Sequence, residues 1–288
     1  MIRMKLEIDL SYQVSEPGCD FIFNLHAAET SCQHVVSENL SLSQSLTPEM
    51  FRDNVSGNRY FRLRGNPGLL NVNYCATVNV TPSLVDPDSI PETPISLLPV
   101  SILHYIYPSR YCESDRLSKL AIREFGGLWQ GYSRVLAIQN WVRNHVSFAS
   151  NTTNSNTSAV DTIINQVGVC RDFAHLMIAL CRALSIPARF VTGTDYGADP
   201  ILGPPDFHAY VEVYLGNRWY IFDPSGTTIP MGLVRIGTGR DAADVSFATI
   251  FGTITSPAPR ISTKAEFDNQ NDWILPYHCA QALSTDRS

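Results

Sequence analysis

The chain has 288 residues, of which 44% are hydrophobic and 17% charged, a composition typical of a soluble globular protein with one large or two ordinary domains. Its 21 Lys and Arg against 27 Asp and Glu give a net charge of −6. No basic run is interleaved with aromatic residues, so we expect no nucleic-acid partner.

The N-terminal stretch MIRMKLEIDLSYQV alternates apolar and polar residues, which is typical of a β-strand rather than of a signal peptide. Later in the chain, no window of about 18 consecutive apolar residues predicts a membrane span. We therefore expect a cytosolic protein that does not associate with a membrane.

Short runs of β-type residues continue through the first hundred positions. Arg59–Gly65 and Leu69–Val80 are bounded by Gly, Pro and Asn, and their pattern predicts antiparallel strands. The proline-rich segment Thr81–Pro99 can form neither a central strand nor a helix interior, so it is the best candidate for a linker. We predict an N-terminal β-rich domain at residues 1–105 and a second domain at residues 106–288.

Helical periodicity appears after this linker. Glu113–Phe125 and Gly131–Phe148 carry apolar residues at helical spacing, and the polar loop ASNTTNSNTS follows the second of them. Val160–Val167 predicts another short helix, which Gly168 ends. Together with the predicted antiparallel strands, these helices indicate an α+β fold class.

The stretch GVCRDFAHLMIALCRAL places Cys170 in the first turn of an apolar helix. A lone cysteine in such a place more often fills space than reacts, because reactivity needs a base and a positively charged environment. Steps of about 100° per residue put Ala174, Met177 and Cys181 on the same face as Cys170. We expect this apolar face to pack on a sheet, with Cys181 in the core and the thiol of Cys170 directed toward the next predicted hairpin. The helix N-terminus favours a thiolate there.

That hairpin is predicted by the stretch DFHAYVEVYLGNRWYIFDPSG, with a two-residue turn at Gly216 and Asn217. A turn of this length places Tyr210 opposite Asp223, and His208 lies two positions away on the same face. Diagonal neighbours of this kind are about 7–8 Å apart at the backbone, within reach of an imidazole and a carboxylate.

Taken singly, His208 is more often a partly buried histidine with a structural role, and Asp223 before a proline more often begins a turn. Taken together they matter, because a nucleophile such as Cys170 needs a base that a third group orients. One feature opposes this arrangement. His208 shares its face with Glu212, whereas the other face of the same strand is apolar, and a helix packed on that other face would direct His208 away from the thiol.

Other candidate residues have weaker support. His175 is turned about 140° from Cys170 on the helix and is expected to have a structural role. Asp195, Asp199 and Asp206 form a loose acidic cluster that we interpret as solvated loop residues rather than calcium ligands. The seven cysteines are odd in number and lack a CxxC pair, which predicts no disulfide framework and no zinc site. We expect neither a metal nor a cofactor.

Three segments in order resemble the transglutaminase-like superfamily, in particular its bacterial members that are described as cysteine proteases. They are Gly168–Gly193, Asp206–Gly226 and Gly237–Val245, and the match is specific from Ser158 to about Val245. Asn54–Gly65 and Tyr107–Leu117 resemble the N-terminal β region of these proteins and the connection after it, with lower specificity. The tail from Ser256 onward matches no motif.

The resemblance implies a papain-like core in which Cys170 is the nucleophile, His208 the general base and Asp223 the residue that orients it. The chemistry would be acyl transfer at a peptide or protein amide, and we favour hydrolysis by a peptidase or amidase. Protein-glutamine transamidation is the alternative when an amine accepts the acyl group. A non-enzymatic interaction module on the same fold is a further alternative, although such modules usually lack a member of the triad. The only oxyanion donor that can be placed is the backbone N–H of Cys170. Substrate identity and oligomeric state stay open.

Overall fold

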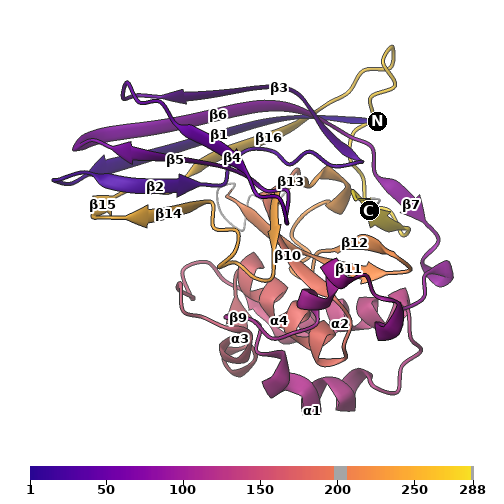
Figure 1. Ribbon diagram of the computed structural model, residues 1–288. Helices are drawn as coiled ribbons and strands as arrows, with labels where there is room; N and C mark the ends of the chain where they lie inside the picture. Colours follow the sequence, from indigo (N-terminus) through magenta and orange to yellow (C-terminus); the bar gives the residue numbers. More distant parts are fainter. Residues whose placement is uncertain (198–205, 287–288) are drawn as a thin grey trace.

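The computed structural model describes residues 1–197 and 206–286, which form a stack of layers (Figure 1). Two antiparallel sheets of mostly N-terminal strands lie uppermost in the view, a central sheet lies beneath them, and the helices cover the lower side. The α+β class expected from the sequence is confirmed. Among the described residues, no helix is both long and apolar enough to cross a membrane.

The upper layers form a β-sandwich. One sheet has the order β15-β1-β6-β3, with β16 also paired to β1, and the other has the order β14-β2-β5-β4. The strands of the first sheet are β1 (Ile2–Val14), β3 (Gln33–Leu42), β6 (Gly68–Val80), β15 (Ile254–Thr255) and β16 (Arg260–Glu266). Those of the second are β2 (Cys19–Phe23), β4 (Glu49–Arg52), β5 (Arg59–Gly65) and β14 (Ala248–Phe251).

Strict alternation of residues explains why these strands form a sandwich. Along β1 and β6 every second residue is buried, so each strand turns one apolar row toward the facing sheet. Phe21 stacks on Phe23, and Phe23 stacks on Phe61, in the core between the sheets. Tyr12 of β1 packs against both Phe21 and Phe23 of β2, and these contacts join the two sheets into one hydrophobic unit.

The second predicted domain, residues 106–288, is not confined to the central sheet and the helices. Strands β14, β15 and β16 come from residues 248–266, and they pair with β2 and β1 of the sandwich. In the linker segment, β7 (Ser83–Val85) pairs with β17 (Ala282–Ser284) near the C-terminus. The chain therefore returns to the N-terminal layers after it has built the central sheet.

The central sheet has the antiparallel order β12-β11-β10-β13. Its strands are β10 (Ala188–Thr194), β11 (His208–Leu215), β12 (Arg218–Phe222) and β13 (Val234–Gly239). Its lower face packs on the helices, and its upper face contributes Val191, Tyr210 and Ile221 to the core of the sandwich. Because both faces are covered, nearly every residue of β10 and β11 is buried.

The helices follow the boundaries that the periodicity predicted to within a few residues. They are α1 (Ser114–Phe125), α2 (Tyr132–His145), α3 (Ala159–Asn165) and α4 (Cys170–Ala183). The short parallel pair β8 (Ser147–Phe148) and β9 (Val167–Gly168) joins the end of α2 to the start of α4. Helix α4 is the central one: it packs on α1, α2 and α3 on one side and on β10 and β11 on the other.

Candidate functional site

Cys170 is the first residue of α4, and it is partly buried rather than enclosed. The side chain of Asp172 caps this helix by accepting a hydrogen bond from the amide of Val169 at 2.9 Å. Gly168 makes this possible, because a Cβ at that position would lie 2.8 Å from the Cβ of Asp172. The sequence GVCRD thus builds a helix start that presents a thiol and its backbone amide at the positive end of the helix dipole.

The capping residue Asp172 is held in place by contacts with the loop that precedes α3. Thr153 donates to Asp172 at 2.7 Å, and Arg171 binds the other carboxylate oxygen at 3.0 Å while also donating to the carbonyl of Asn154. Asp172 is fully buried, so these partners are needed to satisfy its charge. They hold the first turn of α4 in one position.

The hairpin has the predicted register. Leu215 pairs with Arg218 across a turn in which Gly216 and Asn217 both have positive φ, as expected for a two-residue turn of this kind. His208 begins β11, and Asp223 follows directly after β12. The distance from Nε2 of His208 to Oδ1 of Asp223 is 3.4 Å, and both side chains are almost fully buried.

Helix α4 packs on the face of β11 opposite to His208. Ala209, Val211, Val213 and Leu215 lie in the same hydrophobic cluster as Met177 and Cys181 of α4. The helix thus packs on the apolar face that the sequence analysis named as opposing the arrangement, because the apolar row of β11 offers the helix more surface to bury.

The thiol nevertheless comes close to His208, because Cys170 contacts the residue that directly precedes β11. Its Sγ lies 3.9 Å from the carbonyl oxygen of Phe207, the residue before His208. Since β11 begins at His208, the imidazole is not separated from the thiol by the sheet. The structure thus brings Cys170, His208 and Asp223 together at one end of the central sheet.

The electrostatics of His208 favour its charged form. Burial alone would lower the pKa of the imidazole, but the neighbouring Asp223 carboxylate and the Cys170 thiol raise this pKa well above its ordinary value. An imidazolium in this place can stabilise a thiolate and can donate a proton.

Asp223 is held as a carboxylate. Burial alone would raise its pKa, but the charge of His208 and hydrogen bonds from Ser225 and Thr228 lower it to about 2. Arg143 of α2 donates to the backbone carbonyl of Asp223 at 2.9 Å and so fixes the turn after β12. This turn also favours Gly226, because its φ of +67° is one that residues with a Cβ rarely adopt.

His175 and Cys181, the alternatives on the same helix, lie away from this end of the sheet. His175 is fully buried and stacks on Tyr111, and its Nε2 accepts a hydrogen bond from the amide of Ala242 at 3.2 Å. Cys181 is also fully buried, in the hydrophobic core. The third segment of the resemblance, Gly237–Val245, therefore contacts α4 from the side and supports its position.

One residue of the loose acidic cluster lies in the site. Oδ2 of Asp195 is 3.5 Å from Nδ1 of His208, and its side chain is only 8% exposed, so its interpretation as a solvated loop residue is wrong. In the sequence, Asp195 directly follows the strand Ala188–Thr194. Only the pairing of β10 with β11 shows that this aspartate lies beside His208. Asp206 is exposed, and Asp199 lies outside the described residues.

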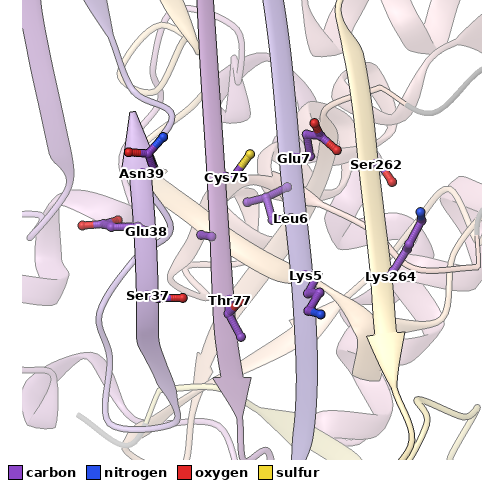
Figure 2. A pocket seen from close by; sticks show the side chains of 11 residues that line it. Lys5, Leu6, Glu7, Ser37, Glu38, Asn39, Cys75, Thr77, Ser262 and Lys264 are labelled. Atoms are coloured by element: carbon purple, nitrogen blue, oxygen red, sulfur yellow. The ribbon is translucent and has the colours of Figure 1, made fainter. Parts of the chain in front are cut away.

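Within residues 1–197 and 206–286, His, Cys, Asp and Glu form no group suited to a metal ion. A hollow of about 380 Å³ lies elsewhere, on the outer face of the first sandwich sheet (Figure 2). Lys5, Glu7, Thr77 and Lys264 line it from neighbouring strands. It lies on the face of this sheet that points away from the sandwich core, and it contains neither Cys170 nor His208.

Comparison with known proteins shows the family of the chain. The profile of the transglutaminase-like superfamily matches residues 120–224, and that of the bacterial transglutaminase N-terminal domain matches residues 2–101. The chain belongs to the transglutaminase-like superfamily.

One relative is a Cytophaga hutchinsonii protein of known crystal structure, which is provisionally named a cysteine protease. The two chains are 41% identical and superpose with a TM-score of 0.91, over 98% of this chain and 97% of the relative. Protein ML0607 of Mycobacterium leprae is 32% identical over 117 residues, and Rv2569c of Mycobacterium tuberculosis is 32% identical over 110 residues. These alignments cover 39% and 34% of this chain, and they span only 42% and 35% of the two mycobacterial proteins.

Proposed function

We propose that the protein is a thiol-dependent hydrolase of amide bonds, a peptidase or amidase, in which Cys170, His208 and Asp223 act together. The observation that carries this proposal is the buried His208 between a carboxylate and a thiol at a helix N-terminus. The provisional name of the Cytophaga hutchinsonii relative supports the same reaction class.

In the acylation step, the Cys170 thiolate attacks the carbonyl carbon of the amide and forms a carbon–sulfur bond. The backbone N–H of Cys170 is among the first amides of α4, which have no acceptor within the helix, so it can donate to the developing oxyanion. His208 transfers a proton from Nδ1 to the leaving nitrogen as the carbon–nitrogen bond breaks. The products are a free amine and a thioester on Cys170.

In the deacylation step, neutral His208 accepts a proton from water while the water oxygen attacks the thioester carbon. The carbon–sulfur bond breaks, the acid is released, and the thiolate and imidazolium are regenerated. Asp223 keeps the ring oriented and stabilises its positive charge through both steps.

The first experiment measures alkylation of Cys170 by iodoacetamide near pH 6. A thiolate paired with His208 reacts rapidly at this pH, whereas an ordinary thiol is almost unreactive. His208→Ala should slow the reaction, and His175→Ala is the matched control because His175 lies on the same helix but away from the thiol. Slow alkylation of the native protein, unchanged by His208→Ala, would support an interaction module instead.

The second experiment separates hydrolysis from transamidation. The protein is incubated with a peptide library in ¹⁸O-water, with and without a primary amine, and the products are weighed by mass spectrometry. Hydrolysis places ¹⁸O in a new carboxylate, whereas transamidation replaces the leaving ammonia or amine with the added amine, so the mass changes by the difference between the two. Cys170→Ser is expected to abolish either product.

A further inference from the structure

A second carboxylate contacts the imidazole of His208. Oδ2 of Asp195 lies 3.5 Å from Nδ1, and Oδ1 of Asp223 lies 3.4 Å from Nε2. The side chains of His208 and Asp195 are 5% and 8% exposed, so water screens this ion pair poorly. Each ring nitrogen of His208 therefore faces a carboxylate of its own.

The backbone of β10 directs Asp195 to this position. Gly193 pairs with His208 across the two strands, and alternation along a strand places residue 195 on the same face as residue 193. The pairing of β10 with β13 shifts between Thr192 and Gly193, and such a bulge changes the direction of the side chains that follow it. Gly193 itself is tightly constrained, since a Cβ there would lie 2.3 Å from the carbonyl oxygen of Val234.

The charged groups around His208 come from three elements. Cys170 approaches from α4, Asp223 from the end of β12, and Asp195 from the end of β10, while Asp206 adds its negative charge to the field at Asp195. Burial raises the pKa of Asp195, the charge of His208 opposes this increase, and the negative charge of Asp223 adds to it. Asp195 and Asp223, both buried, are therefore two carboxylates that interact with the same cation, the imidazolium of His208.

We propose that Asp195 is a positioning residue, which orients the Nδ1 side of His208 and stabilises the imidazolium that pairs with Cys170. Nε2 faces Asp223, so Nδ1 is the nitrogen available to the thiol and to the leaving amine. Asp195 therefore acts at the nitrogen that exchanges the proton, and Asp223 acts at the opposite nitrogen. The catalytic part of this role rests on the proposed function, but the charge interaction with His208 does not.

The test is the titration of the His208 ring, followed by NMR of the full chain with ¹⁵N-labelled histidine. Asp195→Asn should lower the pKa of His208 by about 1 to 2 pH units, because a nearby opposite charge shifts a buried group by about this amount. Asp206→Asn is the matched control, since this exposed carboxylate has no contact with the ring, and it should leave the titration nearly unchanged. If Asp195→Asn does not fold, Asp195→Ala provides the same measurement.

A second readout is the pH dependence of Cys170 alkylation and of amide hydrolysis. With Asp195→Asn, the acid and basic limbs of the hydrolysis profile should both move to lower pH, because the lost negative charge favours the thiolate and disfavours the imidazolium. A purely structural role would lower the rate without moving the limbs. An unchanged pKa of His208 in Asp195→Asn, or an equal shift in Asp206→Asn, would overturn the proposal.

These outcomes are separate from those that test the function. If no amide is hydrolysed but Asp195→Asn shifts the titration of His208, the proposed function fails and the pairing of Asp195 with the ring stands. If amides are hydrolysed and the titration does not move, the positioning role fails and the hydrolase stands.

Discussion

Replacing Asp223 with asparagine removes one charge from the site with little change in side-chain shape. In the native protein the pKa of Asp223 falls from an ordinary value of 3.8 to about 2, even though burial opposes this change. A difference of this size corresponds to about 2 to 3 kcal/mol in favour of the charged form. Asp223→Asn should therefore lower the free energy of unfolding by roughly that amount at pH 7.

The loss should depend on pH in a defined direction. A carboxylate with a lowered pKa stabilises the fold above its unfolded value, near pH 4, and loses this effect as the pH falls through about 2. The difference between the native protein and Asp223→Asn should thus be largest above about pH 5 and shrink toward pH 2. The raised pKa of His208 reports the same ion pair from the other side, so it adds no second contribution.

The assay is urea unfolding at pH 7, 5 and 3, with Asp20→Asn as the control. Asp20 forms an ion pair with Arg64 in which both side chains are more than half exposed, and its loss should change stability by less than about 1 kcal/mol. If Asp223→Asn lost the same stability at pH 7 and pH 3, the charge of this carboxylate would not be its cause.

Four further results are expected. Asp223→Asn should lower the rate of amide hydrolysis by about 10²-fold or more while Cys170 stays alkylatable, and a rate within threefold of the native value would contradict the assigned role. His175→Ala should reduce stability by about 2 to 4 kcal/mol in urea, because its buried ring stacks on Tyr111 and contacts Phe190, but the rate per folded molecule should stay unchanged. Asp286→Ala should cost about 3 kcal/mol or more, since the buried Arg189 and Arg235 would share Glu212 alone; a loss below 1 kcal/mol would show that the network tolerates an unpaired charge. Gly193→Ala should lower the thermal midpoint and the activity together, because its Cβ would displace the backbone of β13, and a native midpoint would show that the strands can separate at no cost.

The local sequence pattern was sufficient to predict the hairpin register and the helix start that build much of the site. A two-residue turn fixes the register of its hairpin, so the sequence alone predicted that Tyr210 faces Asp223 and that His208 lies on the same face. The helix starting at Cys170 was equally predictable, because Gly168 ends the preceding pattern and an apolar periodicity begins after it. Both results depend on residues fewer than about twenty positions apart, where backbone geometry determines which side chains share a face.

Contacts between distant segments required the tertiary structure. The sequence did not determine which face of β11 would receive α4, and burial of its apolar row placed the helix opposite His208. It did not show that β10 lies beside β11, which is what brings Asp195 to the imidazole, or that residues 248–266 return to the sandwich. The physical reason is that strand order and helix packing are decided by the total surface buried across the whole chain, and no local pattern contains that sum.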